Sequence, residues 1–179
     1  MKLLTETRLW RLLFTPAPET YPAHAFYVAL SQEARNPFFY TEAHVPDTLD
    51  GRFDLTVVHL FLALERVKRE PASEPFQRAL LECFFSSLDR SLRELGVADL
   101  GVGKRIRKMA DACHGRLTRY PRDWAHPDTR RQALLDNVYR GDTVRADAGM
   151  DALLAQLARY ESDLASQPLS TLSQGQLAT

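Results

Sequence analysis

Apolar residues recur every three or four positions along most of the chain, and no stretch of useful length alternates as a β-strand does. This spacing is typical of the buried face of an α-helix. The pattern predicts an all-α protein, a single compact bundle of about six or seven helices. Proline, glycine and capping residues bound the predicted helices, which cover residues 5–14, 22–35, 52–69, 73–95, 100–120, 128–140 and 146–165.

One predicted helix, residues 52–69, is apolar almost all the way round. Such a helix is usually buried on every side, so we expect it at the centre of the bundle. A narrow polar stripe along it carries Arg52 and His59. A buried polar group needs a hydrogen-bond partner, and for the His59 ring we expect a carboxylate of the next helix, Glu82 or Asp89.

Asp89 and Arg93 lie four residues apart on the polar face of the predicted helix 73–95. By themselves they would form an exposed ion pair worth roughly 0.3–0.5 kcal/mol. If this face packs against the stripe that carries Arg52 and His59, the four side chains form a polar lock between the two central helices. Asp50 completes this candidate structural motif, because Asp50 or a neighbour is expected to cap the central helix.

The chain length of 179 residues suits one domain that buries its own core without disulfides or metals. We expect an N-terminal helix and a proline-rich connection over residues 1–20, a helical domain over residues 21–166, and a disordered tail over residues 167–179. The N-terminal segment has no continuous signal-peptide core. A segment of this composition could touch a membrane or a hydrophobic client, but we expect it to dock on its own domain.

Hydrophobic residues make up 45% of the chain and charged residues 26%, which argues against a membrane span and against wholesale disorder. Cys83 and Cys113 lie in apolar helical patterns without CxxC spacing. They are therefore expected to be buried, reduced thiols of a cytoplasmic protein. No motif indicates a cofactor: residues 101–105 do not match a phosphate-binding loop, and the aspartates around Gly51 lack the ligand spacing of a calcium loop.

Charge is unevenly distributed, although Lys and Arg together equal Asp and Glu at 23 each. Residues 104–131 contain nine basic and three acidic residues, a net charge of +6. Cations at the start of a helix are disfavoured by roughly 0.3–1 kcal/mol each. Either nearby carboxylates offset this cost or the residues meet an anionic partner, such as ribosomal RNA, lipid head groups or an acidic protein. The candidate partner-binding residues are Lys104, Arg105, Arg107 and Lys108.

Two long motifs resemble those of a known family. The first is Pro-Asp-Thr-Leu-Asp-Gly-Arg-Phe-Asp-Leu-Thr-Val-Val-His over residues 46–59, preceded by Ala34-Arg35 and Phe39-Tyr40. The second runs from Asp-Arg-Ser-Leu-Arg-Glu-Leu-Gly-Val to Lys-Arg-Ile-Arg-Lys-Met-Ala over residues 89–110. With Tyr120 and Asn137-Val138-Tyr139, these stretches resemble the ubiquinol-cytochrome c chaperone family over about residues 21–141.

The resemblance implies a non-catalytic chaperone that binds newly synthesised cytochrome b and promotes assembly of ubiquinol-cytochrome c reductase. It also implies contacts with the ribosomal exit region or a partner assembly factor. Because no transit-type leader is present, we expect a bacterial, cytoplasmic member with peripheral contact at the cytoplasmic face of the inner membrane, and no DNA partner. The alternative is a ribosome- or RNA-binding module that acts through residues 104–131, and an enzyme centred on His59 comes third because no nucleophile or metal set accompanies that residue.

Overall fold

The computed structural model describes residues 22–94 and 99–177, so the predicted helix 5–14 lies outside the described residues. Within these ranges the chain is helical and contains no strand, which confirms the all-α prediction. The helices are α2 (Pro22–Glu33), α3 (Phe38–Thr41), α4 (Leu49–Val67), α5 (Glu74–Glu94), α6 (Asp99–Asp123), α7 (Pro127–Asn137), α8 (Thr143–Ser166) and α9 (Leu169–Leu172).

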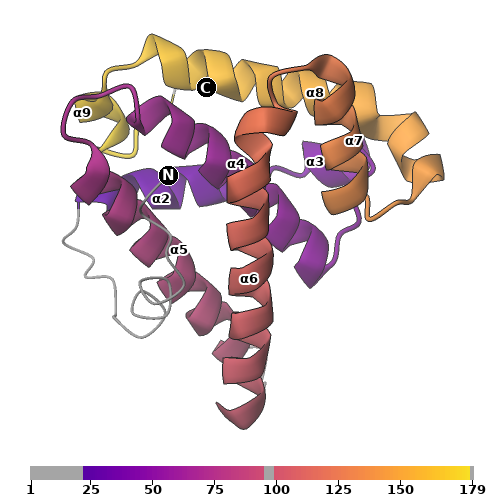
Figure 1. The fold of residues 1–179 in the computed structure, drawn as a ribbon, viewed down its shortest axis with the longest axis horizontal. Helices are drawn as coiled ribbons and strands as arrows, with labels where there is room; N and C mark the ends of the chain where they lie inside the picture. The colour runs from indigo at the N-terminus through magenta and orange to yellow at the C-terminus, as the bar shows by residue number, and fades with distance from the viewer. Residues whose placement is uncertain (1–21, 95–98, 178–179) are drawn as a thin grey trace.

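Helix α4 is the centre of the fold, as its apolar sequence predicts. It contacts α2, α5, α6 and α8, and most of its residues are buried. Figure 1 shows α8 across one end of the molecule and α6 crossing in front of α4. The Thr48 hydroxyl caps α4 by accepting a hydrogen bond from the Gly51 amide at 3.1 Å, while Asp50 lies in the first turn, where a carboxylate is favoured.

The segment between α3 and α4 packs closely against two helices. A Cβ atom added at Gly51 of α4 would lie 2.0 Å from the Pro46 carbonyl oxygen, and one added at Gly149 of α8 would lie 2.0 Å from the Ala43 carbonyl oxygen. The Tyr139 hydroxyl donates a hydrogen bond to the same Ala43 oxygen at 2.7 Å. The two glycines therefore let the backbone of this segment lie directly on α4 and α8.

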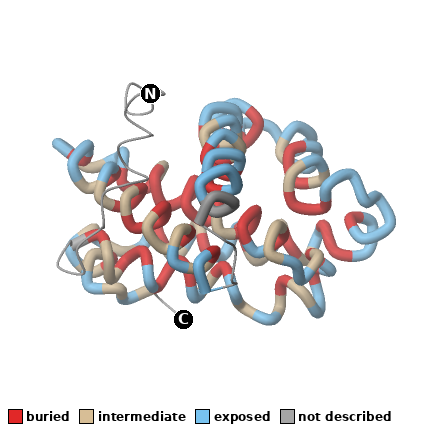
Figure 2. The backbone as a smooth tube through the Cα atoms, turned by 90° about the horizontal axis from the view of Figure 1, so that it is seen from below, coloured by how far each residue is buried: buried red, intermediate tan, exposed pale blue. Residues whose placement is uncertain are grey.

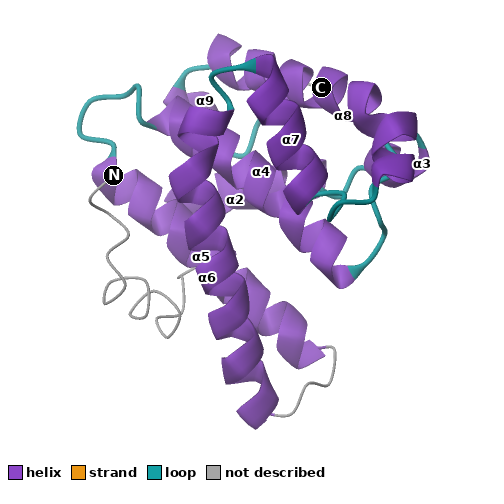
Figure 3. Cartoon of the chain, turned by 45° about the vertical axis from the view of Figure 1, so that its right-hand side comes forward, coloured by secondary structure: helices purple, strands orange, loops and turns teal. Residues whose placement is uncertain are grey.

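The last turns of α5 and the first turns of α6 project from the body of the molecule, and α6 runs from there back into it (Figures 1 and 3). Figure 2 shows buried residues where the helices face one another and exposed residues around the outside. Cys83 and Cys113 are free thiols within this core, as predicted. Burial raises the pKa of Cys83 to about 11 and that of Cys113 to about 12, so both are protonated at neutral pH.

Two boundary predictions were wrong. A break was expected from Pro121 to Pro127, but α6 continues through Pro121 to Asp123. Proline has no backbone N–H, so Pro121 costs α6 one hydrogen bond, in its last turn. Tyr120 and Trp124 hold that turn by packing on the Phe61 ring, with ring centroids 5.3 and 5.2 Å away.

The tail expected to be disordered contains α9, and its Leu172 side chain is fully buried. Arg66 of α4 holds the connection to α9, because its guanidinium donates hydrogen bonds to the carbonyl oxygens of Leu164 at 2.9 Å and Gln167 at 2.8 Å. Residues after α8 are thus part of the folded body through at least Leu172.

Candidate functional site

An ion cluster around one buried carboxylate joins three parts of the fold. The Asp54 carboxylate on α4 is fully buried, and its Oδ1 atom lies 2.8 Å from Nη2 of Arg116 on α6. Its Oδ2 atom accepts hydrogen bonds from Nε and Nη2 of Arg140, which follows α7, at 3.0 and 2.8 Å. Asp50 adds a second carboxylate, with Oδ2 3.4 Å from Arg140 Nη1. We call Asp50, Asp54, Arg116 and Arg140 the ion cluster.

The surroundings of Arg116 make the pairing specific. Its Nε atom donates to the side-chain oxygen of Asn137 at 3.1 Å, and its guanidinium lies over the Phe53 ring, 5.5 Å from the centroid. Asn137 in turn donates from Nδ2 to the Ala133 carbonyl at 2.8 Å. Planar guanidinium groups suit such combined ionic and stacking contacts. Arg116 thereby ties α6 to both α4 and α7.

The turn after α7 brings Arg140 to Asp54. Arg140 adopts a left-handed conformation with φ of 56°, which side chains rarely take, and Gly141 follows with φ of 80°. Burial raises the pKa of Asp54 to about 6, whereas the charges of Arg116 and Arg140 favour its ionised form. A buried charge is costly unless it is paired. The strained turn is therefore needed to bring Arg140 to Asp54, which it pairs together with Arg116.

The sequence analysis did not identify this cluster. A signal was available: Asp54 lies between Phe53 and Leu55, away from the narrow polar stripe of an otherwise apolar helix, which favours a buried and paired side chain. The partners could not be found by spacing, since Arg140 is 86 residues away. Tyr120 and Asn137-Val138-Tyr139, which contribute to the family resemblance, lie beside this cluster or in the adjoining core.

The predicted partner of His59 was wrong. Its Nδ1–H donates to the Leu55 carbonyl at 2.8 Å, one turn earlier in α4. The ring packs between Phe39, with centroids 5.3 Å apart, and Tyr160, at 4.8 Å. Burial lowers the pKa of His59 to about 4, so the side chain is neutral at physiological pH. A fully buried, neutral histidine among aromatic rings is a core residue.

The predicted polar lock is also not formed as expected, because its members have local partners. Arg52 lies at the exposed start of α4 and pairs with Asp47 at 2.7 Å, and Arg93 pairs with Asp89 at 2.7 Å within α5. The environment of the stripe changes along α4, exposed at Arg52 and enclosed at His59. An ionic link from α4 does form, but it reaches α6 and not α5, through the pairing of Asp54 with Arg116.

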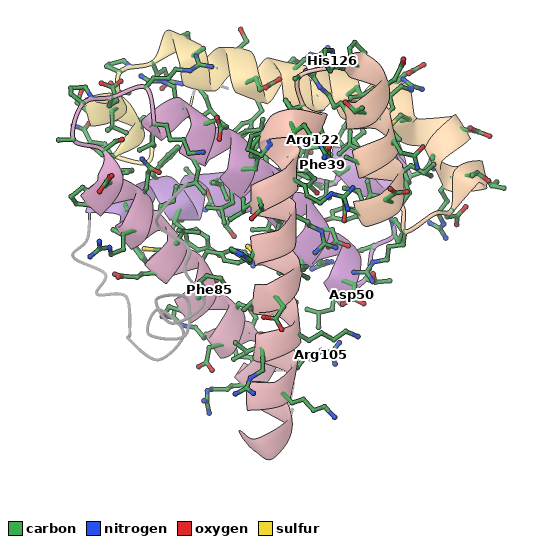
Figure 4. All side chains as sticks on the ribbon, in the orientation of Figure 1. Phe39, Asp50, Phe85, Arg105, Arg122 and His126 are labelled. Carbon is green, nitrogen blue, oxygen red and sulfur yellow. The ribbon has the colours of Figure 1, made fainter. Side chains whose placement is uncertain are left out.

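The basic segment 104–131 divides into two parts. Lys104, Arg105, Arg107 and Lys108 are exposed on the first turns of α6 that extend from the body, where Figure 4 labels Arg105. The later cations have partners within the fold. Arg116 belongs to the ion cluster, Arg130 lies over the Trp124 ring at 5.1 Å, and Arg131 pairs with Asp151 at 2.6 Å. Lys104, Arg105 and Lys108, together with the largely exposed Arg119 and Arg122, are thus the cations of the segment that are most open to a further partner.

A pocket of about 260 Å³ opens between α4, α6 and α8. Its walls include Phe61, Arg66, Trp124 and Glu161. Several of its polar groups already pair, since Trp124 Nε1 donates to Glu161 at 3.1 Å and Arg66 binds backbone oxygens. Small-molecule sites usually measure about 300–1,000 Å³ and present unpaired polar groups to the ligand. The pocket therefore gives no support to an enzyme active site.

The described residues contain no group of three or more His, Cys, Asp or Glu side chains placed to hold a metal ion. None of the described helices is both long and apolar enough to cross a bilayer.

Comparison with known proteins identifies the family. The model of the family described as ubiquinol-cytochrome C chaperone matches residues 41–179, a range that starts later and ends later than the resemblance in the two motifs. The crystal structure of the Cbp3 homolog from Brucella abortus is similar, with 32% identity, a TM-score of 0.70, and 89% of this chain and 88% of that chain covered. Among curated proteins nothing matches. The chain therefore belongs to the ubiquinol-cytochrome c chaperone family.

Proposed function

We propose that this protein is a non-catalytic chaperone that binds newly synthesised cytochrome b and promotes assembly of ubiquinol-cytochrome c reductase. The observation that carries the proposal is the family match over residues 41–179, supported by the similar fold of the Brucella homolog. The family gives the role in assembly. The cytochrome b client and action in the cytoplasm, at the face of the inner membrane, are the specific parts of the proposal.

The chemistry of the side chains supports a role without catalysis. His59 is enclosed and neutral, and burial keeps Cys83 and Cys113 protonated. A nucleophile or general base must reach its substrate, and none of these three groups is accessible in the described fold. Binding and release of a client, by contrast, require a stable scaffold and an exposed surface.

A deletion strain tests the proposal. We expect the assembled cytochrome bc complex to fall strongly in membranes of the strain, with recovery when the wild-type chain is restored. Affinity purification of the tagged full-length chain under translation arrest should bring down cytochrome b. Normal levels of the complex in the deletion strain would contradict the role in assembly, and a loss of complex without any association with cytochrome b would contradict the client.

The alternative, an RNA-binding module acting through residues 104–131, receives less support. Arg116 is enclosed in the ion cluster, and Arg131 has an ion-pair partner. Only the exposed part of the segment at 104–108, with Arg119 and Arg122 further along α6, could meet a large anionic partner.

A further inference from the structure

The outward face of α6 carries two groups of cations, one near each end, with the exposed Asp111 between them. The opposite face packs into the core through Ile106, Met109, Cys113 and Leu117. The basic face, as we define it, consists of Lys104, Arg105, Arg107, Lys108, Arg119 and Arg122, all exposed. At 1.5 Å per residue, the 18 steps from Lys104 to Arg122 extend about 27 Å. Figure 4 shows Arg105 and Arg122 toward the two ends of this face.

The charge of the basic face is neutralised only in part: Arg107 has an interaction within the protein, and Asp111 adds one negative charge between the two groups of cations. Within residues 22–94 and 99–177, no ion pair engages Lys104, Arg105 or Lys108. Arg119 and Arg122 approach Asp123, but the side chains of the two arginines remain 68% and 78% exposed. Arg116, although it also lies on α6, belongs to the ion cluster and not to this face.

We infer that the basic face of α6 docks on the surface of an anionic lipid bilayer. The inference rests on the proposed function, in which the client is a membrane protein while no described helix of the chaperone can itself span a membrane. Lysine and arginine side chains near an anionic leaflet are attracted to it additively, and the attraction weakens with salt. A single straight helix presents its cations to a flat surface at similar depth.

The side chains of α6 favour a bilayer over RNA as the occupant. Single-stranded RNA is held by stacking on exposed aromatic rings, and none is offered here, because Tyr120 is fully buried and Trp124 is 8% exposed. From Lys104 onward, the large apolar side chains of α6, Ile106, Met109, Cys113 and Leu117, are also buried in the core. The contact is therefore electrostatic, without insertion into the hydrocarbon, and should be reversible.

Vesicle co-sedimentation of the purified full-length chain tests the inference. We expect binding to vesicles with 30% phosphatidylglycerol and at least tenfold weaker binding to neutral phosphatidylcholine vesicles. Bound protein should be released when salt rises from 50 to 300 mM, a range over which the screening length falls by about twofold. The variant Lys104→Glu with Lys108→Glu should bind at least tenfold more weakly than wild type. The control Arg78→Glu with Arg159→Glu makes the same change in net charge at exposed positions of α5 and α8 and should bind within twofold of wild type.

The results separate the inference from its competitors. Equal binding to neutral vesicles, or equal loss in the control variant, would overturn it. So would absence of vesicle binding together with salt-sensitive binding of an RNA probe that the Lys104 and Lys108 variant loses. The vesicle assay does not depend on the client, so vesicle binding with a normal cytochrome bc complex in the deletion strain would refute the proposed function while supporting the docking surface. Loss of the complex in that strain with no vesicle binding would refute the docking surface while supporting the proposed function.

Discussion

Arg116 on α6 places its guanidinium 2.8 Å from the fully buried carboxylate of Asp54 on α4. This pair is the ionic connection between the central helix and the helix that carries the basic face. Arg140 binds the other carboxylate oxygen and connects the same point to the turn before α8. One buried carboxylate therefore links α4, α6 and the turn before α8, in addition to the apolar packing of α6 on the core.

Replacing that carboxylate should be strongly destabilising. In Asp54→Asn, Arg116 keeps its charge but loses its counter-ion in a site where it is largely enclosed. Removing one partner of a buried pair costs roughly 3–5 kcal/mol. We expect the free energy of unfolding in urea to fall by about this amount. In cells the abundance of the chaperone should fall with it, and the cytochrome bc complex should decrease as a consequence.

The matched control is Asp47→Asn, which removes a carboxylate from the exposed pair with Arg52. Exposed pairs contribute little to stability, so the unfolding midpoint of this variant should stay close to that of wild type. Equal stability of the Asp54 and Asp47 variants would show that the ion cluster does not hold the helices together.

The helices could be predicted from the sequence far better than their ionic contacts. Apolar periodicity requires no knowledge of partners, and it located α4 because a helix that is apolar all round must be central. The polar lock failed because Arg52 and Arg93 find carboxylates within five residues. The partner of Asp54 could not be inferred in the same way, since it depends on a turn 86 residues later with an arginine at positive φ.

Replacing glycine with alanine should lower stability at two positions and raise it at a third. Gly51→Ala and Gly149→Ala would each place a methyl group 2.0 Å from a backbone carbonyl oxygen, so the 43–46 segment would have to move. Overpacking of this kind costs about 1–3 kcal/mol. Gly115→Ala, on the exposed side of α6 with no neighbour within 4 Å, should stabilise by up to about 1 kcal/mol through helix propensity.

Chemical denaturation of the three variants checks this prediction, with Gly115→Ala as the internal control for alanine in a helix. The interpretation of the 43–46 segment fails if Gly51→Ala and Gly149→Ala unfold at or above the denaturant concentration of wild type.

His59 should make the fold sensitive to acid. Its pKa is about 4 in the folded state and near 6.5 when unfolded, so between these pH values the unfolded chain binds the additional proton. Stability from this group is complete above pH 6.5 and is lost as the pH falls toward 4, by about 3 kcal/mol in total. Asp54 acts in the opposite direction, because its raised pKa lets the folded state take up a proton near pH 6.

Comparison of wild type with His59→Phe isolates the histidine from that opposing contribution. The difference in unfolding free energy between the two proteins should shift by about 3 kcal/mol in favour of the variant as the pH falls from 7 to 4. Thermal or urea unfolding at several pH values measures it. Parallel pH profiles for the two proteins would mean that His59 is not held neutral by the core.

The two buried tyrosine hydroxyls near α8 should differ in what their removal costs. Tyr139 donates to the Ala43 carbonyl at 2.7 Å, so Tyr139→Phe leaves a buried acceptor with one partner fewer and should cost about 1–2 kcal/mol. The Tyr160 hydroxyl has no hydrogen-bond partner within the described residues, and Tyr160→Phe should be neutral or slightly stabilising. Both changes remove the same atom from a buried ring, so the difference in their urea midpoints reports the hydrogen bond to Ala43 alone. If Tyr160→Phe proved as costly as Tyr139→Phe, the 43–46 segment would not owe its position to that bond, and the close approach at Gly51 and Gly149 would have to hold it unaided.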